Sequence, residues 1–274
     1  MKYFLIFLSI YINSQIGINV KYHYRYVNDT LKNNIIIKEM NLDIKKNEVK
    51  YYYQSFYEMD STKNMRSGSV SVSAPDSQLI KRKLDGWQNE NFVFAKGKYF
   101  VIKSNDTLRW KVLEETKIVK GYKLQKAKTD FGGRKWTAWF CTDIPFQEGP
   151  YKFRGLPGLI FEIYDNKGYF TYQIYKINSL TKSIPTENFL ETNFGKKPIP
   201  ITRDEYNKLL LDDYFNPFSD MFGTGINEEN ELFIFGKLVK NAEDIKEILT
   251  VYQKHKRELY NPIELDKAVK YPSK

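Results

Sequence analysis

Cysteine and histidine are almost missing from this chain of 274 residues, which contains one cysteine and two histidines. A zinc site needs several histidine, cysteine or carboxylate ligands at recognisable spacing, and a catalytic cysteine normally needs a histidine base. His23 and His255 are isolated, and neither lies near Cys141 in the sequence. We therefore expect no metal site, and we expect Cys141 to be a buried thiol on a strand rather than a nucleophile.

Motifs of several common enzyme classes are missing as well. The sequence has no G-x-S-x-G nucleophile elbow, no P-loop and no dinucleotide-binding fingerprint. Secreted hydrolases often carry one of these motifs. We therefore predict no cofactor, and we assign no catalytic residue.

The sequence also lacks a concentrated basic tract and, after its first residues, a long hydrophobic run. The formal net charge is +10, but the lysines are scattered, and the densest basic cluster is Lys81-Arg82-Lys83. A nucleic-acid-binding face would gather such residues on one surface, whereas scattered charge fits attraction to anionic lipid or polysaccharide surfaces. We expect no nucleic-acid partner and no transmembrane segment.

The first residues have the pattern of a secretory signal peptide. Lys2 precedes an apolar run over residues 3–11, and polar residues follow at positions 13–15. This run is too short to span a membrane, and no cysteine follows it to support a lipoprotein anchor. We predict a signal peptide over residues 1–15 and a single soluble domain over residues 16–274; the alternative is a buried first strand.

Aromatic residues, by contrast, are abundant, with 21 tyrosines and 19 phenylalanines, and they suit the half-buried surface of a sheet. Tyr22, Tyr24 and Tyr26 alternate with polar residues, which is the period of a strand with one buried face. Lys96-Gly97-Lys98 separates two further runs as a hairpin turn would. The pattern predicts a mainly antiparallel β fold, α+β overall, with strands up to about residue 200. We expect a surface loop over residues 59–84, with one short strand at residues 70–72.

The stretch over residues 120–177 predicts two hairpins joined by a constrained loop. The first turns at Gly132-Gly133 and the second at Asp165-Asn166-Lys167-Gly168, where glycine and asparagine supply the turn geometry. Between them, Leu156-Pro157-Gly158-Leu159 fits a type II turn, in which Pro157 fixes φ and Gly158 accepts a positive φ.

The pattern becomes helical over residues 201–274. Thr202-Arg203-Asp204-Glu205 is a capping box that begins one helix, and Asn216-Pro217 ends it. A second helix begins after Asn241 and ends before Asn261-Pro262. We expect the apolar stripes of both helices to pack against the sheet.

The hexapeptide Gly155-Leu156-Pro157-Gly158-Leu159-Ile160 resembles the signature of the GLPGLI family of Gram-negative envelope proteins. Further segments are similar to the family pattern in the same order: Gly121-Tyr122-Lys123, Trp136-Thr137-Ala138-Trp139-Phe140, Asp143-Ile144-Pro145, Gly149-Pro150-Tyr151-Lys152-Phe153 and Asn261-Pro262-Ile263-Glu264-Leu265. A cysteine is common in the family where this chain has Leu124, so a family disulfide at that position is not expected.

The resemblance implies a curved, bowl-like or half-barrel sheet with appended helices, similar to the N-terminal domain of one class of peptide-N-glycosidase. It also implies an exported protein of the periplasm or outer membrane. The family is largely of unknown function and is often encoded near TonB-dependent receptors. We therefore expect a non-catalytic module that binds an envelope protein, a small ligand or a glycan, as an accessory to TonB-dependent uptake.

The predicted binding residues flank the signature hexapeptide. They are Trp136, Trp139, Tyr151, Phe153, Arg154 and Glu162. Aromatic rings beside arginine can stack on sugar or aromatic ligands, although the same residues can also form core and rim. Trp136 and Trp139 lie on opposite faces of one strand, so at most one of them lines any single pocket.

The alternative function is a secreted hydrolase that uses carboxylates near the signature. The candidates are Asp143, Glu148, Glu162 and Asp165. Glycosidase chemistry needs two carboxyl groups that face one substrate, but Glu162 and Asp165 point to opposite faces of a continuous strand. Asp165 suits a turn, and a salt bridge from Glu162 to a lysine is the simpler interpretation. The prediction is therefore a protein that binds without catalysing.

Overall fold

The computed structural model describes residues 16–29, 34–61, 78–217, 232–234, 237–239 and 242–272. Twelve strands form one sheet in the order β12-β6-β5-β4-β3-β2-β1-β11-β10-β9-β8-β7. Their bounds are β1 (Gly17–Asp29), β2 (Asn34–Lys45), β3 (Glu48–Tyr53), β4 (Leu79–Lys83), β5 (Gln88–Ala95), β6 (Lys98–Asn105), β7 (Lys111–Val119), β8 (Tyr122–Phe131), β9 (Arg134–Cys141), β10 (Leu159–Asp165), β11 (Phe170–Leu180) and β12 (Ile199–Pro200). The predicted signal peptide, residues 1–15, lies outside the described residues.

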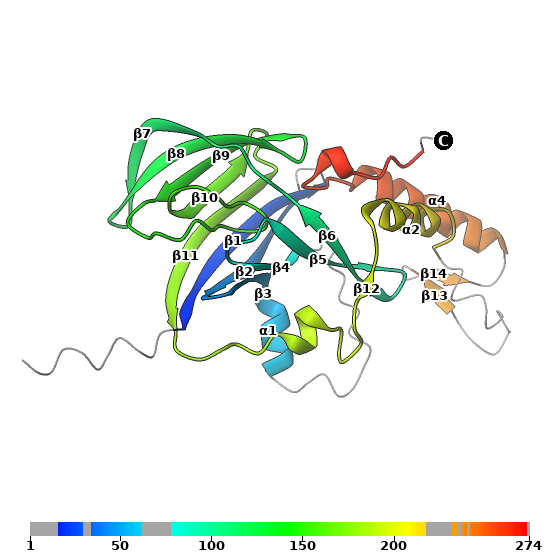
Figure 1. Cartoon of the computed structure of the whole chain (residues 1–274). Helices are drawn as coiled ribbons and strands as arrows, with labels where there is room; N and C mark the ends of the chain where they lie inside the picture. The colour runs from blue at the N-terminus through cyan, green and yellow to red at the C-terminus, as the bar shows by residue number, and fades with distance from the viewer. Residues whose placement is uncertain are drawn as a thin grey trace, which may run out of the picture.

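Consecutive strands of this sheet mostly lie side by side through hairpins, while β1 lies between β2 and β11 in the interior. The β12–β6 pair is parallel, and the other pairs are antiparallel. Figure 1 shows β7, β8 and β9 arching over one end of the sheet, with the two C-terminal helices, in residues 203–215 and 242–258, at the other end. The predicted fold class, a mainly antiparallel curved sheet with C-terminal helices, is confirmed.

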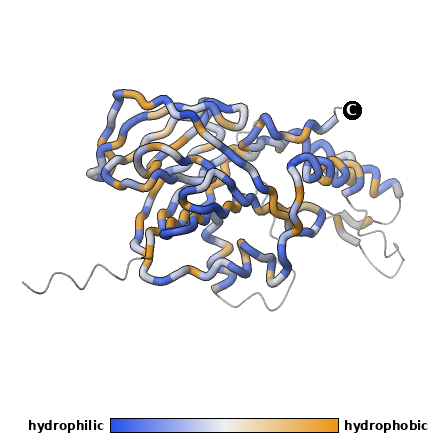
Figure 2. Tube along the Cα trace, viewed as in Figure 1, coloured by the Kyte–Doolittle hydropathy of each residue, from blue (hydrophilic) through white to orange (hydrophobic). Residues whose placement is uncertain are grey.

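Alternating residues along the strands place one face of the sheet in the core. Tyr22 and Tyr24 of β1 are fully buried, whereas His23 between them is exposed. Figure 2 shows hydrophobic residues interspersed with hydrophilic ones along the sheet. The β8–β9 hairpin turns as predicted at Gly132 and Gly133, whose φ angles are +64° and +71°. Side chains with a Cβ rarely adopt these angles, which is why glycine pairs favour this turn.

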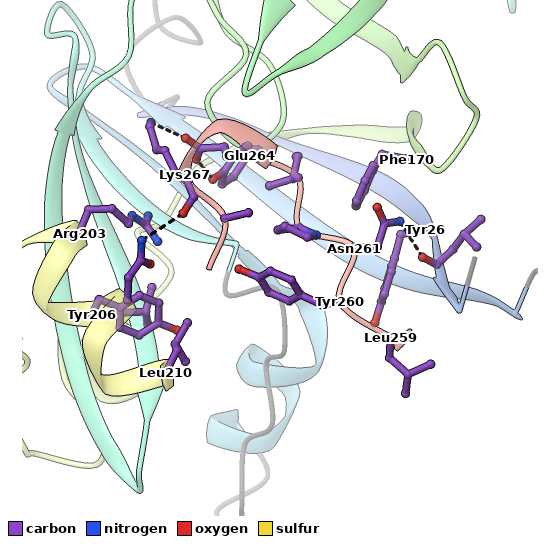
Figure 3. A pocket seen from close by; sticks show the side chains of 17 residues that line it. Tyr26, Phe170, Arg203, Tyr206, Leu210, Leu259, Tyr260, Asn261, Glu264 and Lys267 are labelled. Carbon is purple, nitrogen blue, oxygen red and sulfur yellow. Dashed lines mark hydrogen bonds and ion pairs between the residues drawn. The ribbon is translucent and has the colours of Figure 1, made fainter. Parts of the chain in front are cut away.

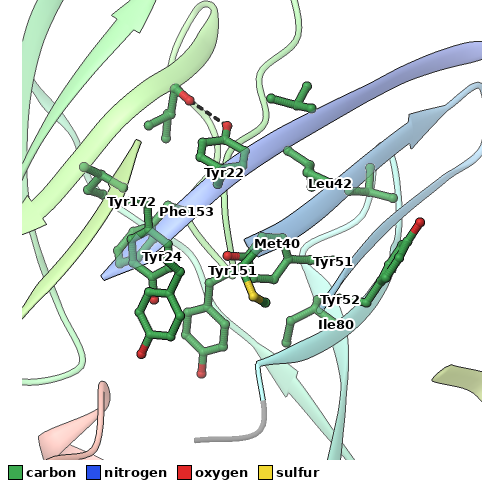
Figure 4. Packing of buried hydrophobic residues seen from close by; sticks show 14 of the residues in the cluster. Tyr22, Tyr24, Met40, Leu42, Tyr51, Tyr52, Ile80, Tyr151, Phe153 and Tyr172 are labelled. Atoms are coloured by element: carbon green, nitrogen blue, oxygen red, sulfur yellow. Dashed lines mark hydrogen bonds between the residues drawn. The ribbon is translucent and has the colours of Figure 1, made fainter. Parts of the chain in front are cut away.

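Stacked tyrosines form the centre of the core (Figure 4). The ring of Tyr24 lies 4.9 Å from that of Tyr26 and 4.7 Å from that of Tyr172, between ring centroids. The buried Tyr22 hydroxyl donates a hydrogen bond of 2.6 Å to the carbonyl of Ile160. Because burial raises the pKa of Tyr22 well above its usual value, this hydroxyl remains a donor. Cys141 is a buried free thiol at the end of β9, as expected.

Two elements differ from the surface loop predicted over residues 59–84. Residues Gln54–Ser61 form helix α1, and β4 is an interior strand between β3 and β5. The predicted surface loop is therefore wrong over β4. The triplet at positions 81–83 has the composition of a loop, but Arg82 is buried because it pairs with Glu148. Residues 62–77, with the short strand expected at 70–72, lie outside the described ranges.

Helix α2 (Arg203–Phe215) begins with the predicted capping box. The Thr202 hydroxyl accepts a hydrogen bond of 3.2 Å from the Glu205 amide, and the Glu205 carboxylate accepts one of 2.8 Å from the Thr202 amide. These bonds satisfy two backbone donors that the first helical turn would otherwise leave unpaired. Tyr206 packs from α2 against apolar side chains of β5 and β6, as expected for this helix.

Helix α4 (Ala242–Glu258) packs differently from the prediction. Its buried Ile248 joins a core with β13 (Leu232–Ile234) and β14 (Lys237–Val239), which form a separate antiparallel pair, rather than with the large sheet. A short π-helix lies at Glu187–Glu191 and a 3-10 helix at Leu265–Lys267. Among the described residues, no helix combines the length and the apolar character needed to cross a membrane.

Candidate functional site

Residues 142–158 connect β9 to β10 and run along the inside of the curved sheet; we call them the crossing segment. Phe153 packs on Trp136 of β9, with ring centroids 4.5 Å apart. Glu148 pairs with Arg82 of β4, a strand from the other half of the sheet. Because strands from both halves reach it, the crossing segment fills the concave side of the sheet.

The signature hexapeptide ends the crossing segment, and it does not form the predicted type II turn. Gly158 is not among the glycines with a positive φ, and its amide donates to the carbonyl of Leu156 at 2.8 Å. A hydrogen bond between residues two apart defines a γ-turn around Pro157. The glycine is required for another reason, since a Cβ at this position would lie 2.1 Å from the Cys141 carbonyl oxygen.

Gly155 is the signature glycine that has a positive φ, at +92°. A Cβ there would lie 2.9 Å from the ring of Trp87. The same ring lies 4.8 Å from the guanidinium of Arg154, measured to the ring centroid. The two glycines of the hexapeptide therefore let the backbone approach Trp87 on one side and the end of β9 on the other.

The first of two buried ion clusters lies under the crossing segment. The Glu148 carboxylate contacts the guanidinium of Arg82 and lies 3.2 Å from that of Arg154. Arg82 also donates to the Tyr151 carbonyl at 2.8 Å, and Arg154 donates to backbone carbonyls in the loop after β4. Buried charges are tolerated when they are paired and hydrogen-bonded in this way.

The second cluster, which we call the Lys152 cluster, joins the crossing segment to the C-terminal residues. The fully buried Lys152 ammonium lies 3.1 Å from the Asp106 carboxylate and 2.7 Å from that of Glu264. Lys267 pairs with the same two carboxylates. Burial alone would raise the pKa values of Asp106 and Glu264, but the two lysines outweigh burial and hold both pKa values below their usual range.

The C-terminal segment, residues 259–268, is held on the sheet by Arg134. The Arg134 guanidinium donates to the Pro262 carbonyl at 2.7 Å. Asn261 donates from its side chain to the Val27 carbonyl of β1 at 3.0 Å. These bonds place the C-terminal segment against the end of β1 and the β8–β9 hairpin.

A cavity of about 140 Å³ lies between the end of the sheet, α2 and the C-terminal segment (Figure 3). We call it the tyrosine pocket, because four separate parts of the chain each contribute a tyrosine: Tyr26, Tyr151, Tyr206 and Tyr260. Arg203, Asn207, Glu264 and Lys267 add polar groups to the lining. Apolar side chains, among them Val93, Phe170 and Leu210, complete it.

Three phenols of the tyrosine pocket, those of Tyr151, Tyr206 and Tyr260, stay protonated at neutral pH. Burial raises the pKa of Tyr206 to about 12, and it also raises the pKa of Tyr151 and of Tyr260. The nearby Arg203 charge partly offsets burial at all three tyrosines. The Tyr260 hydroxyl accepts a hydrogen bond of 2.8 Å from the Val269 amide. The pocket therefore combines neutral hydroxyl groups with one nearby guanidinium.

The structure places the six predicted binding residues in two different locations. Four of them are buried inside the curved sheet: Trp136, Tyr151, Phe153 and Arg154. Trp139 and Glu162 lie opposite each other on β9 and β10, where Lys117 lies 2.5 Å from the carboxylate and 4.4 Å from the centroid of the indole. Tyr151 is the member of the set that lines the tyrosine pocket.

Three of the four carboxylates considered for hydrolysis are ion-paired: Glu148 with Arg82, Glu162 with Lys117 and Asp165 with Arg134. Asp165 also accepts the Phe170 amide at 3.0 Å, in keeping with a role in the turn. Asp143 is exposed. The lysine partner expected for Glu162 is therefore present.

Several residues of the tyrosine pocket were not predicted from the sequence: Arg203, Tyr206, Tyr260 and Lys267. The capping box marked Arg203 as the first residue of a helix, and the family-like segment over residues 261–265 marked the neighbourhood of Tyr260. Neither signal indicates that these elements meet the end of β1. A spacing argument along the chain cannot detect a pocket whose residues come from such distant segments.

Comparisons with known proteins give one family match and several similar solved structures, two of which are described below. A family model described as "Protein of unknown function (Porph_ging)" matches residues 132–162, from the β8–β9 turn into β10. No curated protein matches the chain. Solved structures of PNGF-II in the C2 and P21 space groups are similar at 13% identity and a TM-score of 0.49, over 71% of this chain. The match covers 32% and 33% of those chains, so this chain spans about a third of their length.

Proposed function

We propose that this chain is an exported, non-catalytic binding module of the cell envelope, and that it holds a small ligand in the tyrosine pocket. The observation that carries the proposal is the convergence of hydroxyl, amide, cationic and apolar side chains on one cavity. Small-molecule sites combine an apolar lining with a few placed polar groups in this way. The concave side of the sheet, by contrast, is occupied by the crossing segment.

The resemblance to the GLPGLI family supports both the proposed location in the cell envelope and the proposed accessory role in uptake. Its members are envelope proteins often encoded near TonB-dependent receptors, so the proposed module is an accessory to uptake across the outer membrane. The apolar run after Lys2 supports export. On this proposal residues 16–274 form the single mature domain.

If the protein is exported, its signal peptide should be cleaved. We expect the protein purified from the envelope fraction of its native host to have lost residues 1–15, because Lys2 and the apolar run form a cleavable signal peptide. Intact-mass spectrometry of that fraction measures the cleavage site directly. Protein that retains Met1 in the envelope fraction would contradict a cleaved signal.

The ion pairs favour binding over the hydrolase alternative. A general acid on a carboxyl group usually needs a raised pKa, whereas the Lys152 cluster holds the pKa of Glu264, the carboxyl nearest the pocket, below its usual range. Glu162 faces away from the crossing segment and pairs with Lys117. No pair of described carboxylates near the signature is arranged around the tyrosine pocket.

A ligand screen with a pocket-filling variant tests the proposal. Sugars, amino acids, dipeptides and short organic acids are screened by thermal shift, and hits are measured by calorimetry. Asn207→Phe puts a ring into the lining of the tyrosine pocket, and we expect at least about a tenfold loss of affinity, since a blocked cavity excludes the ligand. Lys208→Phe, at the exposed next residue of α2, is the matched control and should bind as the wild type does.

Two results would overturn the proposed site. One is a screen in which no compound binds the wild-type protein. The other is a hit that Asn207→Phe binds as tightly as Lys208→Phe does, with both variants folded by circular dichroism.

A further inference from the structure

We infer that the ligand of the tyrosine pocket carries a single negative charge, as a small carboxylate does, and that the Arg203 guanidinium binds it. The inference rests on the proposed function, because it names the chemistry of the ligand in the same pocket.

Arg203 is a cation without an acidic partner at the edge of the pocket. In the part of the chain that the structure describes, its guanidinium makes no ion pair and donates no side-chain hydrogen bond. It lies over the ring of Tyr206, 5.6 Å from the centroid. By contrast, Arg82 and Arg134 are each paired with a carboxylate. An arginine that keeps its donors free beside a cavity is suited to bind a planar anion.

The charges of the Lys152 cluster, of which Glu264 and Lys267 line the pocket, cancel without Arg203. Asp106 and Glu264 contribute two negative charges, and Lys152 and Lys267 contribute two positive charges at distances of 3.1 Å or less. Arg203 is then a surplus of one positive charge beside a partly desolvated space. One charge matches a carboxylate better than a doubly charged phosphate group.

Tyr260 offers a second donor to the same space. Its hydroxyl oxygen accepts the Val269 amide hydrogen bond, but within the described residues its proton has no acceptor. Figure 3 shows the Arg203 guanidinium and the Tyr260 hydroxyl directed into the space between α2 and the C-terminal segment. A carboxylate there can accept from both groups, with one oxygen toward each.

The cavity volume limits the ligand. At about 140 Å³, the pocket is close to the engineered cavity of about 150 Å³ that binds benzene. Phe170, Leu210 and Val93 supply apolar contacts for a short hydrocarbon part. The class that fits is a short aliphatic or aromatic carboxylic acid, or the carboxylate end of a larger molecule.

The test compares acids with their neutral isosteres on the full mature protein. Butanoate and benzoate are titrated by calorimetry against butanamide and benzamide, and inorganic phosphate is the other anion. We expect the wild type to bind the acids about 10- to 100-fold more tightly than the amides, which is the range for a charge-assisted hydrogen bond, and to prefer the acids to phosphate.

Two charge-matched variants locate the effect. Arg203→Gln should lose the preference for acids over amides, whereas Arg109→Gln, which removes the same charge from an exposed loop residue after β6, should keep it. Thermal melts confirm that both variants are folded. The acid-to-amide ratio of the wild type needs no variant, so the comparison stands even if Arg203→Gln is unstable.

The outcomes separate this inference from the proposed function. Equal binding of acids and amides, or an acid preference that Arg203→Gln retains, overturns the carboxylate assignment while the pocket remains a ligand site. Tighter binding of phosphate than of the acids contradicts the inference that the ligand carries a single negative charge. If only sugars or neutral peptides bind in the wider screen, the ligand is not a carboxylate, although the proposed binding function is supported. No binding by any compound defeats both.

Discussion

Replacing Lys152 by methionine is expected to lower the free energy of unfolding by about 3–5 kcal/mol, the range for breaking a buried ion pair from one side. Methionine matches the volume of the lysine stem, so the main change is the lost charge. Asp106 and Glu264 would then share Lys267 alone, and two buried carboxylates would be left with one cation. Urea denaturation at neutral pH measures the loss.

The same cluster gives the effect a definite dependence on pH. Asp106 and Glu264 have lower pKa values in the folded protein than in the unfolded chain. Their contribution to stability is therefore complete above the unfolded values of about 4 and is lost as the pH falls through the lower folded values. The difference between wild type and Lys152→Met should be largest at neutral pH and should narrow as the pH is lowered below about 4.

Lys135→Met is the matched control, because Lys135 is an exposed residue of β9. Its cost should stay within about 0.5 kcal/mol, as for most surface substitutions. A loss below about 1 kcal/mol for Lys152→Met, the average for any point mutation, would show that the cluster contributes little to holding the C-terminal segment. If the difference in unfolding free energy between the wild type and Lys152→Met does not change with pH, the charges of Asp106 and Glu264 do not cause the loss of stability.

Gly158→Ala is expected to cost about 3 kcal/mol, the upper end for forcing extra volume into a packed site. The added Cβ would lie 2.1 Å from the Cys141 carbonyl oxygen and 3.0 Å from the Thr142 Cα. Both are backbone atoms, so the contact cannot be relieved by rotating a side chain. The γ-turn and the end of β9 would have to separate, and denaturant melts report the cost.

Gly168→Ala separates this cause from backbone conformation. Gly168 lies in the β10–β11 turn with a φ of +67°, and a Cβ there would meet nothing within 4 Å. Its cost should be about 1–2 kcal/mol, the penalty for an L-residue in the left-handed region. If Gly158→Ala proves as mild as Gly168→Ala or milder, then close approach is not the reason for glycine in the hexapeptide.

The strands and turns were accessible to sequence reasoning because their signals are local. Alternation in β1 and glycine in the β8–β9 turn report on neighbours within a few residues, and so does the capping box at Thr202. Strand β4 was not predicted from the sequence, because its burial depends on a distant partner. Arg82 enters the core only when Glu148, 66 residues away, supplies the opposite charge.

The tyrosine pocket was not predicted for the same reason, since residues from four distant segments form it. Tyr26, Tyr151, Tyr206 and Tyr260 are ordinary residues of a strand, a loop, a helix and a tail, and nothing in their own neighbourhoods marks them. The Trp136 and Phe153 rings stood out because they are large and lie near the signature, but size predicts burial as well as it predicts binding. The parity argument for Trp136 and Trp139 held, since it depends only on the period of a strand.

The interior position of β1 delays the assembly of the sheet. Gly17 lies opposite Leu180 in the β1–β11 ladder, so one side of β1 has no partner until β11 is available. Sheets that depend on such distant pairings form slowly, because the entropy cost of closing a long loop comes before the stabilising contacts form. Until then the tyrosine-rich edge of β1 is an open template for another strand. A chain shortened before Phe170 would keep that edge permanently and would be prone to associate with its own copies.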